Sequence, residues 1–234
     1  MSLGSAFQSP ETKRAHVRSL FATIADRYDL ITRLLSYGQD RRWKARLIRE
    51  AGITSADVVL DVACGTGDIA LLARAAGART VFGLDLTPRM LTVASRKGRD
   101  VAFVAGDMGA LPIASASVTL VTTGYGLRNV PDLDTAIGEL ARVVRPGGRI
   151  LSLDFNRPES AVIRGAYLGY LTAVGSVLGW ALHRDPDTYR YIPASIRRYP
   201  GARGVSARLR AHGFTRVRHV PLLFGLMTLH IAYR

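Results

Sequence analysis

Hydrophobic residues recur every three or four positions in the first part of the chain. Between residues 11 and 35 they form one stripe with Lys and Arg between its members, at Val17, Leu20, Phe21, Ile24, Tyr28, Ile31 and Leu35. This spacing predicts an amphipathic helix over 11–35. A second, strongly basic helix is predicted over 40–51, and Gly52 stands at a position where helices commonly end.

From residue 58 onward, short apolar runs alternate with amphipathic segments. The runs predict buried strands at 58–63, 80–84, 101–105, 118–123 and 149–155, and the segments between them predict helices at 69–76, 88–96 and 133–144. A turn is expected at 145–148. Such alternation is typical of an α/β fold whose parallel sheet carries helices on both faces. After a helix at 205–211, apolar runs at 217–223 and 227–233 predict a terminal antiparallel hairpin.

The segment 156–204 does not follow this alternation. Its central stretch 166–182 carries no charge, and it is shorter than the roughly 20 apolar residues that cross a bilayer. We therefore expect a buried helix or an apolar lid there. The chain is predicted to be one domain, in which a helical cap (1–52) precedes the main body (53–234) with its helical lid insertion (156–204).

The composition fits a folded protein of a reducing compartment. Hydrophobic residues make up 48% of the 234 residues, which is ample for one core and excludes a disordered chain. The single cysteine, Cys64, cannot form an internal disulfide. Residues 1–14 lack the apolar stretch of a signal peptide. We expect a cytoplasmic location.

A glycine loop follows the first predicted strand, in the sequence Asp61-Val62-Ala63-Cys64-Gly65-Thr66-Gly67-Asp68. Gly65 and Gly67 allow a tight turn and a close approach to a ligand. Together with Ala70 they also fit the loose dinucleotide pattern, so NAD is an alternative. Asp61 and Asp68 would repel a pyrophosphate, and they suit a ligand with a cationic ammonium and sulfonium.

Two further acids end the next two predicted strands. Asp85 can accept hydrogen bonds from both hydroxyls of a ribose, and Asp107 can accept one from an adenine amino group. Leu86 and Met108 can sandwich the base. Three acids at three successive strand ends are more specific than a glycine loop alone, although Asp also caps helices.

The pattern over 55–155 and the terminal hairpin resembles the class I S-adenosylmethionine-dependent methyltransferases. The similarity then narrows to the ubiquinone/menaquinone biosynthesis C-methyltransferase family. It is carried by Tyr28-Asp29, Ser36-Tyr37-Gly38, Trp43-Lys44, Gly126-Leu127-Arg128-Asn129-Val130, the stretch 142–148, and Tyr189-Arg190-Tyr191 with Ser195-Ile196. The Gly-Leu-Arg-Asn block is the most discriminating part, because generic methyltransferases lack it.

This resemblance implies a fold, a cofactor and a reaction. The fold is a Rossmann-like, mostly parallel sheet of seven strands with an antiparallel terminal hairpin. The cofactor is S-adenosyl-L-methionine, held by Asp61, Gly65, Thr66, Gly67, Asp85, Leu86, Asp107, Met108 and Gly124. The reaction is methylation of a ring carbon of a prenylated lipid quinol, from demethylmenaquinol to menaquinol or at the related benzoquinol step.

The chain departs from the family pattern at three positions. The family usually has Asn in place of Thr32 and His in place of Asp40, and both positions concern the substrate side. It often has Ser where Gly124 stands, so this chain lacks a hydroxyl that contributes one cofactor hydrogen bond there.

Arg128 is the first candidate for catalysis, because it follows the fourth strand, where methyltransferase substrates meet the cofactor. A guanidinium stays protonated, so Arg128 is expected to stabilise a phenolate and orient water. The alternative is a salt bridge to Asp132. Tyr28 and Asp29 are weaker catalytic candidates, with a core tyrosine and a surface acid as the alternative.

Other residues are assigned lesser roles. Tyr189, Tyr191 and Arg197 of the predicted lid are substrate-side candidates, and Cys64 is expected to fill space. The five histidines show no ligand spacing, so no metal site is predicted.

The charge balance favours anionic partners. Lys and Arg number 32 against 18 Asp and Glu, for a net charge of +14. A nucleic-acid methyltransferase or basic nucleic-acid-binding protein is the alternative function. Aromatic residues are only 8% and no binding motif is present, so no nucleic-acid partner is expected. Peripheral contact with an anionic surface at the inner face of the cytoplasmic membrane is expected instead, unless the charge is merely compositional. A homodimer is left open.

Overall fold

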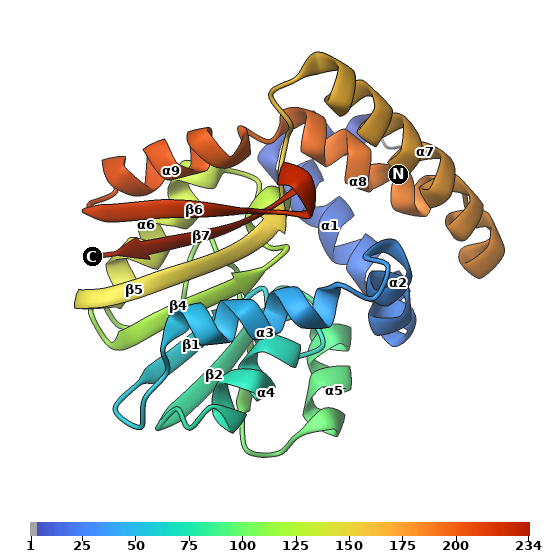
Figure 1. Ribbon diagram of the computed structural model, residues 1–234. Helices are drawn as coiled ribbons and strands as arrows, with labels where there is room; N and C mark the ends of the chain where they lie inside the picture. Colours follow the sequence, from blue (N-terminus) through green and yellow to red (C-terminus); the bar gives the residue numbers. More distant parts are fainter. Residues whose placement is uncertain (1–3) are drawn as a thin grey trace.

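The computed structural model describes residues 4–234, and a single sheet of seven strands forms its centre (Figure 1). The strand order is β3-β2-β1-β4-β5-β7-β6. Strands β1 to β5 pair in parallel, while β7 pairs antiparallel with both β5 and β6. The strands are β1 (Val58–Val62), β2 (Thr80–Asp85), β3 (Ala102–Ala105), β4 (Val118–Gly124), β5 (Val144–Phe155), β6 (Arg216–Leu222) and β7 (Met227–Tyr233). The predicted α/β fold class is confirmed.

One predicted turn lies inside a strand. Residues 145–148 belong to β5, which begins five residues before the predicted 149. The pairing register between β4 and β5 shifts between Val118 and Leu120, and Gly147 takes a φ of +78°. The turn-forming residues are therefore accommodated as an irregularity within the sheet.

Two hydrophobic cores lie on the two faces of the sheet. Helices α3 (Asp40–Ala51) and α4 (Asp68–Ala75) pack on one face, and α6 (Leu133–Val143) and α9 (Gly201–Ala211) pack on the other. Helix α5 (Pro88–Lys97) packs along β2 and β3. Because α3 shares its core with α4, the last helix of the predicted cap is part of the main body.

The predicted helix over 11–35 is wrong at its middle. A 3-10 turn, Ala25–Arg27, separates α1 (Pro10–Ile24) from α2 (Tyr28–Leu35). The hydrophobic spacing continues through the break because both helices contribute to one cluster, in which Ile24 and Ile31 meet Met90 and Tyr189. Residues 1–3 of the predicted cap lie outside the described residues.

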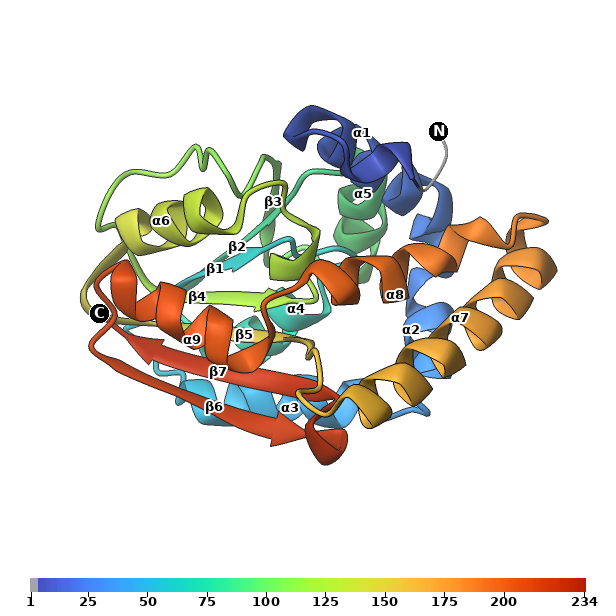
Figure 2. The ribbon, with the colours of Figure 1, turned by 90° about the horizontal axis from the view of Figure 1, so that it is seen from above.

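The insertion forms a helical hairpin beyond the carboxyl ends of the parallel strands. It consists of α7 (Ala161–His183) and α8 (Asp187–Arg198), which pack on each other beside α1 and α2 (Figure 2). The sequence interpretation did not include α8, whose interior contains Pro193. Helix α7 is not a buried helix. It is long and apolar enough to cross a membrane, yet only 17% of its most hydrophobic window is buried.

Candidate active site

The first two acids are buried beneath the glycine loop. Asp61, inside β1, accepts hydrogen bonds from Ala70 N (3.1 Å) and from Thr122 Oγ1 (2.7 Å). Burial raises the pKa of Asp61 to about 7. Asp85, at the end of β2, accepts from Gly65 N and from Thr87 N, each at 2.8 Å. Burial likewise raises the pKa of Asp85. Asp85 therefore also fixes the backbone of the loop, and Asp61 fixes the first turn of α4.

The loop requires glycine where it passes closest to the sheet. Gly67 takes a φ of +83°, and a Cβ placed there would lie 2.9 Å from the ring of Phe103. At Gly124, the end of β4, a Cβ would lie 2.6 Å from Ile69 Cδ1. Both positions thus favour the absence of a side chain. The serine common in the family at Gly124 would require Ile69 to move.

The other two acids already have cationic partners. Asp68 Oδ2 lies 2.8 Å from Lys44 Nζ, and Asp68 Oδ1 lies 2.7 Å from Lys97 Nζ. Although burial opposes it, this pairing lowers the pKa of Asp68. Asp107 Oδ2 lies 2.7 Å from Arg14 Nε, a contact from α1. The repulsion expected of Asp68 toward a pyrophosphate is therefore offset, while Asp61 and Asp85 have no salt bridge within residues 4–234.

A narrow cleft follows the glycine loop. Six of the predicted cofactor residues line it: Asp61, Gly65, Thr66, Asp85, Leu86 and Gly124. Gly67, Asp107 and Met108 do not, and Met108 belongs to the core. Val17 and Phe21 of α1 cover the cleft. Tyr28 and Tyr125 line it along its whole length.

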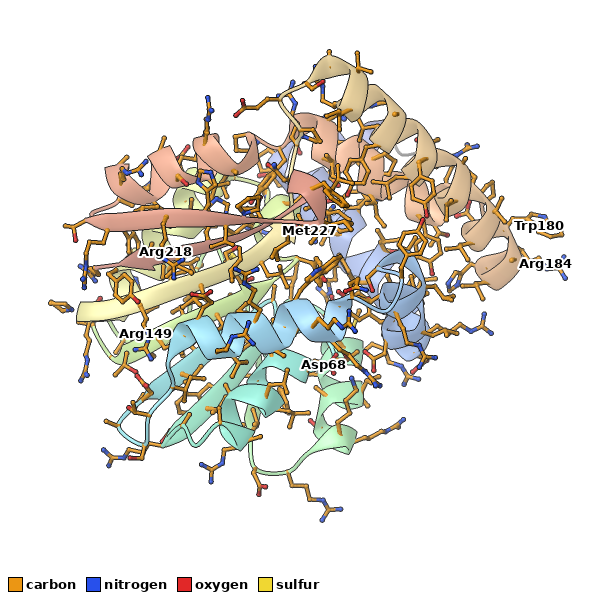
Figure 3. The ribbon with its side chains drawn as sticks, viewed as in Figure 1. Asp68, Arg149, Trp180, Arg184, Arg218 and Met227 are labelled. Atoms are coloured by element: carbon orange, nitrogen blue, oxygen red, sulfur yellow. The ribbon has the colours of Figure 1, made fainter. Side chains whose placement is uncertain are left out.

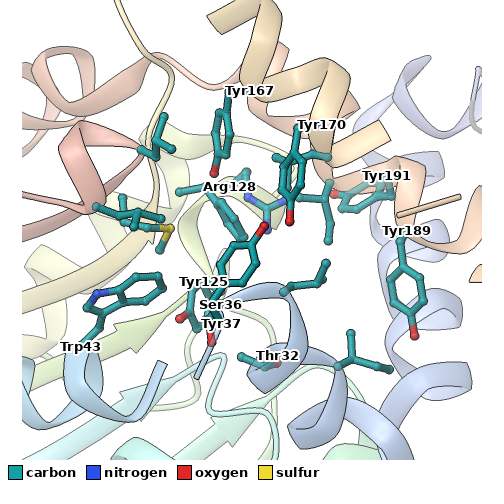
Figure 4. Close-up of a pocket in the computed structure, with 18 of the residues that line it drawn as sticks. Thr32, Ser36, Tyr37, Trp43, Tyr125, Arg128, Tyr167, Tyr170, Tyr189 and Tyr191 are labelled. Carbon is teal, nitrogen blue, oxygen red and sulfur yellow. The ribbon is translucent and has the colours of Figure 1, made fainter. Parts of the chain in front are cut away.

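A large apolar cavity of about 580 Å³ adjoins the cleft, between α1, α2, the hairpin of α7 and α8, and the ends of β5 and β7. Tyr28 and Tyr125 line both spaces, so they form the wall between them. Among the described residues that line the cavity, Arg128 is the only one with a charged side chain. Figure 4 shows Arg128 among the tyrosines of this cavity, with Trp43 at the lower left of the view and Tyr189 at the right.

Arg128 is held by an acid that sequence reasoning missed. It lies in a 3-10 turn (Leu127–Asn129) after β4 and is 5% exposed. Asp154 of β5 accepts from Arg128 N at 3.1 Å and lies 3.4 Å from Arg128 Nε. Arg128 Nη1 also donates to Ser195 Oγ of α8. Burial raises the pKa of Asp154, although Arg128 opposes this.

The proposed alternative partner, Asp132, has a different role. It caps α6 by accepting from Thr135 N at 2.6 Å. Asp154 lies one residue before the end of its strand, as Asp61 does, and Asp85 ends its strand; this position was the signal available in the sequence.

The weaker candidates separate into two groups. Tyr28 lines the apolar cavity, and burial raises its pKa to about 12. Asp29 does not line the cavity: Thr66 Oγ1 donates to it at 2.6 Å and Lys97 Nζ lies 2.5 Å away. Tyr189 and Tyr191 line the cavity, whereas Arg197 is exposed outside it. Asp29 thus ties α2 to the glycine loop.

Comparisons with known proteins agree with this geometry. The family model described as "ubiE/COQ5 methyltransferase family" matches residues 9–234. The chain belongs to the ubiE/COQ5 methyltransferase family. It is 39% identical to a demethylmenaquinone methyltransferase of Thermus thermophilus, covering 92% of this chain and 100% of that one. It is 36% identical to a ubiquinone/menaquinone biosynthesis C-methyltransferase UbiE of Rubrivivax gelatinosus, covering 100% of this chain and 92% of that one.

Solved structures support the fold. A SAM-dependent methyltransferase of Thermotoga maritima, described as a possible histamine N-methyltransferase, superposes with a TM-score of 0.67 at 16% identity, over 93% of this chain and 99% of that one. The protein is an S-adenosyl-L-methionine-dependent methyltransferase of class I fold.

The described residues fit this cofactor. A cationic ligand suits two buried carboxylates, Asp61 and Asp85, that lack a salt bridge. Gly65 and Gly124 line the cleft without side chains, so they leave room for a ligand there. Membership of this family, together with the two buried carboxylates Asp61 and Asp85, excludes NAD as the cofactor. No group of three His, Cys, Asp or Glu side chains able to hold a metal ion is found within residues 4–234.

Proposed function

We propose that this methyltransferase methylates a ring carbon of a prenylated quinol, as the names of its relatives from Thermus thermophilus and Rubrivivax gelatinosus suggest for those proteins. The observation that carries the proposal is the apolar cavity that adjoins the cofactor cleft and holds Arg128 as its charged group. An apolar space of about 580 Å³ suits a flat ring with an isoprenoid tail. The naphthoquinol and benzoquinol steps are both compatible with it.

In the proposed site, the cleft residues Asp61, Gly65, Thr66, Asp85, Leu86 and Gly124 hold the cofactor. S-adenosyl-L-methionine supplies a methyl group on a cationic sulfur. Asp107 is proposed to receive the adenine amino group beside its contact with Arg14, since each carboxylate oxygen can accept two hydrogen bonds. Gly67 is proposed to shape the loop. Met108 belongs to the hydrophobic core and is proposed to support the site from there.

Arg128 is proposed to stabilise the phenolate that makes the ring carbon nucleophilic. Its guanidinium is fixed at Nε by Asp154 and at Nη1 by Ser195, so it needs no reorganisation when the charge develops. Tyr28 is proposed to position the ring at the wall between the two spaces.

Cofactor affinity is expected to depend on pH through Asp61. Its pKa lies near 7 in the free protein, so below that pH the carboxyl is neutral and attracts a cation less. We predict that affinity rises as pH increases through about 7, by at most about tenfold per unit, and then levels off. Calorimetric titration between about pH 5.5 and 8.5 measures this, with Asp61→Asn as the control that lacks the step. A step that persists in Asp61→Asn assigns it to another group.

The apolar residues around the cavity suggest how the enzyme meets an insoluble substrate. Val162 of α7 is 81% exposed and Phe224, beyond β6, is fully exposed, and both line the cavity. At the other end of α7, the guanidinium of Arg184 lies 5.4 Å from the ring of Trp180 (Figure 3). Aromatic and basic side chains at the end of an apolar helix suit a membrane interface.

We therefore propose a cytoplasmic enzyme that attaches reversibly to an anionic membrane surface. Each basic side chain near such a surface contributes about 1 kcal/mol, and salt screens this attraction. We predict co-sedimentation with phosphatidylglycerol vesicles at low salt and release at high salt, with phosphatidylcholine vesicles as the control. Val162→Ser should weaken binding to the vesicles. Val104 is an exposed valine on β3, and Val104→Ser should leave this binding unchanged. Equal binding to both vesicle types would contradict the electrostatic part of the proposal.

The function itself is tested by turnover. The purified enzyme with S-adenosyl-L-methionine should methylate a short-chain demethylmenaquinol or its benzoquinol counterpart, and leave RNA unmodified. Methylation of RNA alone would overturn the proposal. The homodimer also stays a proposal, which light scattering in solution tests.

A further inference from the structure

A buried polar network lies behind the wall between cavity and cleft. Tyr125 Oη donates to Asp40 Oδ1 at 2.6 Å, and Asp40 Oδ2 lies 2.7 Å from Lys44 Nζ. Lys44 in turn contacts Asp68 at 2.8 Å. The side chains of Tyr125, Asp40 and Lys44 are all buried. Asp40 is one of the positions at which this chain departs from its family.

The network connects two separate spaces. Tyr125 lines both the apolar cavity and the cofactor cleft. Asp40, Lys44 and Asp68 line a second, polar cavity of about 630 Å³, whose other charged residues include the exposed Arg41. A path of exchangeable hydrogens therefore runs from the reaction cavity to a polar space near the surface.

The backbone of Tyr125 is strained in a way that fixes this connection. It takes a φ of +61°, in the left-handed region, which is unfavourable for a bulky residue. Tyr125 N donates to Leu153 O at 2.7 Å, and Asn129 Nδ2 donates to Tyr125 O at 2.7 Å. Such strain persists only where the surroundings hold it, and it is concentrated at functional sites.

Methylation of a ring carbon releases one proton per turnover, and the cavity offers few groups that can accept it. Its described lining residues include no carboxylate, lysine or histidine, and Arg128 stays protonated. Two of its tyrosines have a hydroxyl bonded to a titratable side chain: Tyr125 to Asp40, and Tyr189 to His183 at 2.8 Å. Only Tyr125 also lines the cofactor cleft, where the methyl group is transferred.

We propose that Tyr125 is a catalytic residue, which relays the proton of the substrate hydroxyl to Asp40, a positioning residue that acts through it; this rests on the proposed quinol substrate. The substrate O–H bond breaks, and its electron pair stays on oxygen and enters the ring. The proton passes to Tyr125 Oη as the hydrogen of Tyr125 passes to Asp40 Oδ1. After the ring carbon has taken up the methyl group, the neutral ketone tautomerises to the phenol. One proton thus remains on Asp40 and leaves through the polar cavity.

Several charged and polar groups surround the pair. Lys44 and Asp68 adjoin Asp40, while Tyr28 and Asp154 lie near Tyr125. Burial and the carboxylate of Asp40 raise the pKa of Tyr125 well above its usual value. Tyr125 therefore stays protonated at rest and passes a proton on instead of ionising. Although burial opposes it, Asp40 and Asp68 raise the pKa of Lys44, which keeps a cation beside the acids.

The test is the pH profile of kcat for Tyr125→Phe and Asp40→Asn with a short-chain demethylquinol. Both variants should lose about 10²-fold at neutral pH and recover as pH rises, because the substrate hydroxyl then ionises without help. Cofactor affinity and KM should change little. Asp40→His should retain activity. The midpoint of its kcat–pH profile should lie near about 6.5, the ordinary pKa of histidine. His183→Gln, as control, should keep the profile of the unaltered protein.

Four outcomes overturn the relay. A profile of unchanged shape in both variants, or a loss that parallels a fall in thermal stability or cofactor affinity, reduces the pair to a structural role. If only His183→Gln loses activity at neutral pH and recovers it at high pH, the proton is relayed by Tyr189 and His183 instead. If the unaltered enzyme methylates no quinol, the proposed function is wrong, and the relay, which depends on it, is wrong as well.

Discussion

Arg128→Lys should lower kcat by about 10²- to 10³-fold, as the loss of an oxyanion-stabilising donor does in other enzymes. Lysine keeps the positive charge but lacks the planar fork through which Arg128 Nε contacts Asp154 while Nη1 contacts Ser195. The ammonium would sit as a point charge beside Asp154, turned away from a substrate oxygen. Cofactor affinity should be nearly unchanged, because Arg128 does not line the cleft.

Steady-state kinetics and calorimetric titration of the cofactor measure the two quantities separately. Arg197→Lys is a matched control, since Arg197 is an exposed arginine of α8 that does not line the cavity. Retention of charge also avoids leaving Asp154 buried without a partner, a change that would itself destabilise the fold. Equal losses in kcat and cofactor affinity, or no loss at all, would contradict the assignment of Arg128.

Asp85→Asn is expected to weaken S-adenosyl-L-methionine binding by about 10- to 100-fold, the worth of a hydrogen bond to a charged group. The carboxylate accepts from the loop at Gly65 N and from Thr87 N, and an amide has only one acceptor oxygen for these two donors. The substitution therefore disturbs the glycine loop as well as the ribose contact.

Calorimetry gives the affinity, and thermal unfolding shows whether the fold survives. Asp100→Asn, which changes an exposed acid before β3, is the control and should leave affinity unchanged. An affinity equal to that of the unaltered protein would show that Asp85 serves the loop and not the cofactor.

The sequence by itself determined the sheet and the edge at which the acids gather. Strands and helices of an α/β fold differ in hydrophobic period, so their alternation predicted the parallel strands and the terminal hairpin. Acids near the ends of consecutive parallel strands come to the same edge: Asp85 accepts from Gly65 N, and Asp61 lines the same cleft as Gly65. The break at Ala25–Arg27 left no such signal, because the hydrophobic stripe continues across it.

Only the tertiary structure decided which charges are free and which are paired. Lys44 and Lys97 reach Asp68 from α3 and α5, and Arg14 reaches Asp107 from α1. The contact of Arg128 with Ser195 and that of Tyr125 with Asp40 join residues from distant parts of the chain. A hydrophobic period records which side of an element is buried. It carries no information about which polar side chain, brought from another element, will meet it there.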